Sequence, residues 1–237
     1  MPQEPEVVYL IPAYRPAQGL LSLVTDLSTS DRRIVVVDDG SGEDFESLFA
    51  QLDELSNVSL VRHCANLGKG AALKTGLNYA MARFPRAKGV VTADADGQHH
   101  PDDIRAVADR LLENPGSLVL GARAFDRDVP LRSRIGNGLT RALMRLLVGQ
   151  KLADTQTGLR GIPASLVPHL LRLPSSGYEF ELDMLLACKH QACEIVEQPI
   201  RTIYIDSNRS SHFRPVADSM RIYFLLFRFS LLALLTA

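Results

Sequence analysis

Continuous apolar runs alternate with helical stretches along the first half of this 237-residue chain, and that alternation constrains the fold most strongly. A run of 4–8 apolar, β-branched residues bounded by turn signals is typical of a buried strand. Strands that are apolar on both sides are typical of a parallel sheet covered by helices on both faces. The predicted strands are 7–11, 34–37, 58–61, 89–93 and 117–122, and the predicted helices are 16–29, 43–55, 70–83 and one from Pro101.

The second half is less regular. We predict a helix over 133–148, a loop and short strand over 154–161, and a helix over 178–190. Residues 193–205 read as a strand pair or one bent strand, with Pro199 at a bulge or an edge because proline cannot donate to a sheet. We expect this half to extend the same sheet and to wall the site. The predicted fold class is therefore α/β with a mostly parallel, Rossmann-like sheet.

Composition excludes several function classes. A net charge of -1 gives no global field that favours nucleic acid, and the absence of tryptophan, with aromatics at 6%, argues against base-stacking platforms. The three cysteines, Cys64, Cys188 and Cys193, form no C-x-x-C pair and are interpreted as reduced packing residues. The N-terminal stretch carries acids where a signal peptide has bases, which favours a cytoplasmic catalytic face.

The C-terminal stretch 221–237 is apolar almost all round but shorter than the roughly 20 residues that a membrane span needs. Arg214, Arg221 and Arg228 recur every seven residues and form one basic stripe on a helix. Such a stripe beside a broad apolar surface is typical of interfacial helices. We predict a membrane-associating helix over 214–237, cut short before a transmembrane region or complete; a core helix with snorkelling arginines is the alternative.

Four polar motifs fall at the carboxyl ends of predicted strands, where open parallel sheets bind ligands. They are Pro12-Ala13-Tyr14, Asp38 to Ser41, Asn66 to Gly70, and Asp94 to Gln98. One such motif is ordinary loop chemistry, but four on one rim indicate a single site.

Asp94, Asp96 and Gln98 alternate along an extended segment, so their oxygen atoms can face one point. That donor set suits a hard divalent cation, Mg²⁺ or Mn²⁺, bound together with substrate phosphates. The alternative is a set of turn and N-cap acids before Pro101. His99 and His100 are interpreted as surface residues at the helix entry.

The stretch 65–73 is glycine-rich and opens a helix, but it has neither P-loop nor dinucleotide-binding spacing. A backbone-rich turn at a helix N-terminus, with Lys69 beside it, can hold a diphosphate. A capped turn with a solvated lysine is the alternative. One carboxylate of the Asp38-Asp39 pair can accept hydrogen bonds from a ribose hydroxyl or a base N–H.

The segments "IPAYRP", "VVVDDGSGED", "NLGKGAALKTGL", "TADADGQHHPDDI" and "DTQTGLRG" occur in this order. Together they resemble family 2 inverting glycosyltransferases of the GT-A fold, in particular dolichyl- or polyprenyl-phosphate mannose and glucose synthases, over about residues 6–215. The resemblance implies transfer of a hexose from a UDP- or GDP-sugar to a membrane polyprenyl phosphate, at the cytoplasmic face of the membrane. A soluble or glycan acceptor is the alternative.

The resemblance also implies roles for individual residues. Asp94 and Asp96 would be the D-x-D metal pair, with Gln98 as a further ligand. Catalysis would rest on the metal pair and on Asp154 near the reacting sugar, with arginines meeting phosphates: Arg123, Arg132 and Arg134. The donor would contact Pro12, Ala13, Tyr14, Asp38, Asp39, Lys69, Asp94, Gln98, Arg209 and Ser211, the last two in a closing loop over 208–213.

The catalytic domain is predicted to span 1–213. Three acids outside these motifs, Glu179, Glu181 and Asp183, are interpreted as a solvated helix face, although Glu181 could approach the acceptor cleft.

Overall fold

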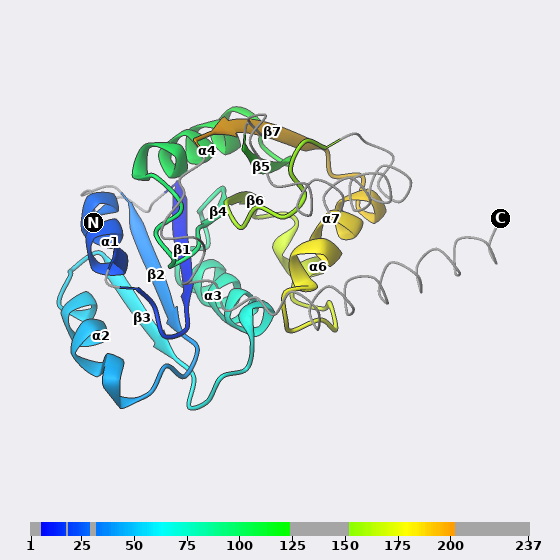
Figure 1. Ribbon diagram of the computed structural model, residues 1–237. Helices are drawn as coiled ribbons and strands as arrows, with labels where there is room; N and C mark the ends of the chain where they lie inside the picture. Colours follow the sequence, from blue (N-terminus) through cyan, green and yellow to red (C-terminus); the bar gives the residue numbers. More distant parts are fainter. Residues whose placement is uncertain (1–5, 18, 29–31, 124–151, 202–237) are drawn as a thin grey trace, which may run out of the picture.

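The computed structural model describes residues 6–17, 19–28, 32–123 and 152–201 (Figure 1). In these ranges seven strands form one sheet in the order β3-β2-β1-β4-β6-β5-β7. Their bounds are β1 Val7–Ala13, β2 Arg33–Asp38, β3 Val58–Arg62, β4 Gly89–Thr92, β5 Leu118–Arg123, β6 Arg160–Pro163 and β7 Ile195–Ile200. The predicted α/β architecture is confirmed, and the second half extends the same sheet as expected.

The sheet is mixed, and its single reversal of direction in the described chain positions the site. Strand β6 pairs antiparallel with β4 and β5, whereas the β1–β2, β1–β4, β2–β3 and β5–β7 pairs are parallel. The carboxyl ends of the parallel strands therefore lie at the same edge as the start of β6. The loop 154–159, which leads into β6, is brought to the rim where the other motifs lie.

Helices cover both faces of the sheet (Figure 1). Side chains alternate along β1, so Tyr9 and Ile11 join one core cluster and Val8 and Leu10 join the other. The first cluster packs under α1 Gly19–Leu27, α2 Glu46–Asp53 (after a short 3₁₀ turn, Glu43–Phe45) and α4 Pro101–Glu113. The second packs under α3 Lys69–Arg83, α6 Val167–Leu170 and α7 Phe180–His190.

The strand order reverses beside β1. The chain runs outward through β1, β2 and β3, then returns through α3 to place β4 on the other side of β1. Crossovers in opposite directions put α1 and α2 on one face and α3 on the other. The loops after β1 and β4 part at this switch point, which is where open α/β sheets bind ligands.

Pro199 lies in β7, an edge strand of the described sheet, as predicted. Cys188 is buried in the core, but Cys64 is exposed, so the packing interpretation is wrong for Cys64. The predicted helix 133–148 and membrane-associating helix 214–237 lie outside the described residues. No helix within the described ranges is both long and apolar enough to cross a membrane.

Candidate active site

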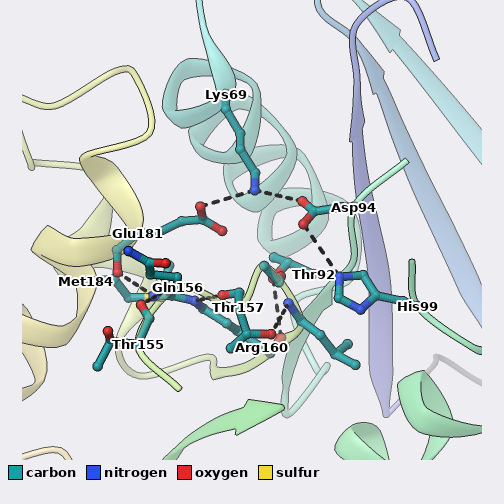
Figure 2. Close-up of polar contacts among 12 residues, drawn as sticks. Lys69, Thr92, Asp94, His99, Thr155, Gln156, Thr157, Arg160, Glu181 and Met184 are labelled. Carbon is teal, nitrogen blue, oxygen red and sulfur yellow. Dashed lines mark hydrogen bonds and ion pairs between the residues drawn. The ribbon is translucent and has the colours of Figure 1, made fainter. Parts of the chain in front are cut away.

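The loop after β4 brings Asp94 beside Lys69 from α3 and His99 from the same loop, and Glu181 from α7 joins this cluster (Figure 2). The Lys69 Nζ atom lies 2.7 Å from Asp94 Oδ1, and His99 Nε2 lies 3.5 Å from Asp94 Oδ2. His99 is only 8% exposed, so its interpretation as a surface residue is wrong. His100 does take the expected helix-entry position, since its Nδ1 accepts a hydrogen bond from the Asp102 N–H at the start of α4.

Glu181 reaches the same cluster from α7. Its Oε2 atom lies 3.1 Å from Lys69 Nζ, so one ammonium group bridges two carboxylates. The solvated-face interpretation is wrong for Glu181 and also for Asp183, which is buried. The reason is that α7 begins against the first turn of α3, where the Ala71 N–H donates to the Ser176 carbonyl at 2.9 Å.

The protonation states of this bridge follow from burial and charge. Burial alone would lower the pKa of Lys69, but Asp94 and Glu181 outweigh it and raise that pKa. Burial would raise the pKa of Asp94, but Lys69 and His99 lower it further than burial raises it. Both groups are therefore charged around neutral pH, and the bridge is an ion pair.

For Asp96, the effects that raise the pKa outweigh those that lower it. Burial, followed by the nearby charge of Asp94, raises the pKa of Asp96, although its Oδ1 atom accepts a 3.0 Å hydrogen bond from the Gln98 N–H. The charge of Asp94 acts on Asp96, and two neighbouring carboxylates are a fitting donor set for a hard divalent cation. Among the described residues no group of three His, Cys, Asp or Glu side chains already surrounds a metal position, and Asp94 pairs with Lys69.

The predicted base and ribose residues meet at the ends of β1 and β2. Ala13 pairs with Asp38 in the sheet register, and Pro12 and Tyr14 flank Ala13. The buried Asp38 carboxylate accepts a 2.9 Å hydrogen bond from the Ser41 N–H, which closes the turn after β2.

Asp39 organises the loop that carries Lys69. Its two carboxylate oxygens accept hydrogen bonds from the Leu67 and Gly68 N–H groups, both at 2.9 Å. Its Oδ1 atom also lies 2.7 Å from His63 Nδ1. Two backbone donors of the predicted anion turn are thus used within the protein, which leaves Lys69 as the charged group of that turn nearest Asp94.

Arg123 and Asp154, both predicted to be catalytic, form an ion pair with 2.6 Å between Nε and Oδ2. Asp154 is 2% exposed, and its Oδ1 atom accepts a hydrogen bond from the Gln156 N–H. A buried carboxylate in this pair is held in one orientation, which favours positioning over proton transfer.

Arg160 was not predicted from the sequence, although it is fully buried beneath the cluster (Figure 2). Its guanidinium donates to the Thr157 carbonyl at 2.9 Å, to the Thr155 carbonyl at 3.3 Å and to the Glu181 carbonyl. It therefore joins the loop before β6 to α7. The available signal in the sequence was a charged residue, Arg160, inside a predicted strand.

Of the other predicted site residues, Arg132, Arg134, Arg209 and Ser211 lie outside the described ranges.

Comparison with known proteins gives the family. The sequence model of glycosyl transferase family 2 matches residues 9–169, which include the D-x-D loop, Lys69 and Asp154. The chain belongs to glycosyl transferase family 2. This family 2 enzyme is 32% identical, over 85% of its length and 87% of the relative's, to the UDP-N-acetylglucosamine–dolichyl-phosphate N-acetylglucosaminyltransferase of Methanococcus voltae. It is 27% identical, over 82% of each chain, to the undecaprenyl-phosphate mannosyltransferase of Micrococcus luteus.

Among solved structures, this family 2 chain resembles glucosyl-3-phosphoglycerate synthase from Mycobacterium tuberculosis with a TM-score of 0.68 at 19% identity. The match covers 94% of this chain and 77% of that one, whose crystal contained Mn²⁺, UDP and glucosyl-3-phosphoglycerate. At this identity the likeness establishes the fold, and the predicted GT-A architecture is confirmed in its α/β, mostly parallel core.

Proposed function

We propose that this glycosyltransferase moves a hexose from a nucleoside-diphosphate sugar, UDP- or GDP-linked, to a membrane polyprenyl phosphate, with inversion at the anomeric carbon. The observation that carries the donor half is the gathering of Asp94, Asp96 and Lys69 at the sheet edge beside the β1 and β2 loop residues. Acids and a lysine together suit a cation-bound diphosphate.

Asp94 and Asp96, with Gln98, would hold Mg²⁺ or Mn²⁺. When bound, such an ion offsets the charge that develops on the leaving diphosphate. Pro12, Ala13, Tyr14 and Asp38 would hold the nucleoside, Asp39 would brace the loop beside it, and Arg209 and Ser211 would contact the donor from the 208–213 loop.

The proposed polyprenyl phosphate acceptor is supported by the names of related proteins. Two proteins that align with more than four-fifths of this chain are named for dolichyl or undecaprenyl phosphate acceptors. A phosphate oxygen is anionic at neutral pH, so it needs little help from a general base. It would attack the anomeric carbon as the bond to the nucleoside diphosphate breaks. Asp154, oriented by Arg123, would position the reacting groups, and Arg132 and Arg134 would contact phosphates.

The test is incubation of the purified full chain with radiolabelled UDP- and GDP-sugars, a polyprenyl phosphate and Mg²⁺ or Mn²⁺. Label that partitions into organic solvent supports the proposal. Label transferred only to water-soluble acceptors contradicts the lipid acceptor and leaves the alternative of a soluble or glycan acceptor. Asp96→Ala should abolish metal-dependent transfer without changing the circular dichroism spectrum.

We also propose that residues 1–213 form the catalytic domain and that residues 214–237 bring it to the cytoplasmic face of the membrane. The support is the basic stripe of Arg214, Arg221 and Arg228, since each basic residue near anionic lipid contributes roughly 1 kcal/mol of binding free energy. Flotation with anionic liposomes should recover the full chain but not a chain ending at residue 213. Equal flotation of the full chain and the shortened chain would contradict this membrane role of residues 214–237.

A further inference from the structure

One ammonium group is shared between two carboxylates that belong to different elements. Lys69 begins α3, Asp94 follows β4, and Glu181 lies in the first turn of α7. The Lys69 Nζ atom lies 2.7 Å from Asp94 and 3.1 Å from Glu181, so either carboxylate can hold it (Figure 2). The three side chains carry one positive and two negative charges.

The backbones that carry Lys69 and Glu181 are fixed relative to each other. The Ala71 N–H donates to the Ser176 carbonyl, and a Cβ added to Gly70 would lie 2.7 Å from the Phe180 Cβ atom. Arg160 donates to the carbonyl of Glu181 from below. Rearrangement within the bridge is therefore confined to side chains, and the four-carbon stem of lysine allows it.

The ammonium would compete with a divalent cation for Asp94. An ion bound to Asp94 would place two positive charges close to the Lys69 Nζ atom, which now contacts Oδ1. The ammonium would then have to leave this oxygen, and the Glu181 carboxylate is already within ion-pair distance of the Lys69 Nζ atom.

We propose that Glu181 is a positioning residue that retains the Lys69 ammonium when a divalent cation takes Asp94. This inference rests on the proposed function, because the cation is part of it. Glu181 acts through Lys69 and does not bind the ion. By keeping the ammonium in the site, it makes Asp94 available and leaves a positive charge beside the place expected for the donor diphosphate.

The experiment is a double-mutant cycle read by Mn²⁺ affinity, with free Mn²⁺ measured by electron paramagnetic resonance. Glu181→Gln should weaken Mn²⁺ binding by about tenfold, because Lys69 then pairs with Asp94 alone. Lys69→Met should strengthen binding by removing the competitor. In the Lys69→Met background, Glu181→Gln should have an effect of less than about twofold, because the side chain through which Glu181 acts is gone.

A direct electrostatic role gives a different pattern. If Glu181 binds the ion or attracts it through space, Glu181→Gln weakens Mn²⁺ binding equally in both backgrounds, and the proposal is overturned. Unchanged or tighter binding by the single variant Glu181→Gln overturns it too. If the wild-type chain binds no Mn²⁺, the metal role in the proposed function also fails, which is a separate result.

Control variants separate the effect of Glu181 from the loss of any negative charge and from misfolding. Glu54→Gln removes the same charge at an exposed position on the C-terminal side of α2 and should keep wild-type affinity. Glu181→Asp retains a carboxylate and should recover part of the affinity lost in Glu181→Gln. Near-ultraviolet circular dichroism confirms folding, and Lys69→Gln replaces Lys69→Met if the methionine variant does not fold.

Discussion

Gly158 lies so close to Asp94 that a Cβ atom on Gly158 would sit 2.2 Å from Asp94 Oδ2 and 2.6 Å from Oδ1. The two residues are far apart in the chain, and they meet because β6 runs antiparallel beside β4. The Thr92 hydroxyl on β4 fastens this approach by donating to the Gly158 carbonyl at 2.8 Å. The position of the D-x-D carboxylate thus depends on the loop that carries Asp154.

Gly158→Ala is expected to displace the Asp94 carboxylate, because the side chain can rotate away from the added methyl group while the backbone cannot. Misplacement of an active-site group by about 1 Å can lower activity by about 100-fold, and we expect a loss of that order in kcat/KM. The melting temperature should change little. Gly19→Ala is the control, since nothing lies within 4 Å of its Cβ position. Wild-type kcat/KM in Gly158→Ala would contradict the prediction.

Asp96→Asn is expected to stabilise the metal-free protein at neutral pH. Burial and Asp94 raise the folded-state pKa of Asp96, so the folded state holds this proton more tightly than the unfolded state. This carboxylate therefore lowers stability as pH rises from about 4 through the folded-state pKa. At pH 7.5 the variant should gain about 1 kcal/mol, or roughly 2–4 °C in melting temperature. The gain should vanish near pH 4.

Asp102→Asn provides a control of opposite sign for this measurement. A hydrogen bond from Arg201 lowers the pKa of the exposed Asp102, so its removal cannot stabilise the protein by the same route. In addition, Mn²⁺ with UDP should raise the melting temperature of the wild-type chain but not that of Asp96→Asn. A lower melting temperature for metal-free Asp96→Asn at pH 7.5 would refute the explanation.

Arg123→Ala should destabilise the protein, because it leaves the buried Asp154 carboxylate without its ion-pair partner. Arg123 is partly exposed, so we expect a loss of about 2 kcal/mol, below the range for fully buried pairs. The double variant Arg123→Ala/Asp154→Asn should recover part of this loss, since it removes the uncompensated charge. The free energy of unfolding in urea is measured for the wild type, the single variant and the double variant. A double variant less stable than Arg123→Ala would contradict the explanation by an uncompensated Asp154 charge.

Arg160→Lys should lower stability even though the charge is kept. The planar guanidinium reaches three carbonyls of two elements, and an ammonium group cannot donate in that geometry. Because buried carbonyls would lose their hydrogen-bond donors, we expect the free energy of unfolding in urea to fall by about 2–3 kcal/mol. Arg172→Lys, at an exposed position, should be neutral. Equal unfolding midpoints for the two variants would show that Arg160 does not join the loop to α7.

Much of the fold was predictable because its signals are local. Apolar runs ended by turn residues gave β1 to β5 within one or two residues, and helices α3 and α4 began where glycine or proline marked them. The acids of the D-x-D loop and Asp38 could be placed at one rim for the same reason. The direction of β6 could not be predicted, since a four-residue strand has no periodicity that distinguishes parallel from antiparallel pairing.

Sequence alone determined the strands and helices of the first half, and which polar motifs follow those strands, because hydrophobic periodicity and turn chemistry act between near neighbours. Only the tertiary structure decided the partners of those motifs. Lys69 and Glu181 are 112 positions apart, and Arg123 and Asp154 are 31 apart. Such contacts depend on how α7 packs against α3 and how β6 enters the sheet. They also decide whether a charge at a given position is solvated, as the sequence predicted for Glu181, or held in an ion pair, as the structure shows.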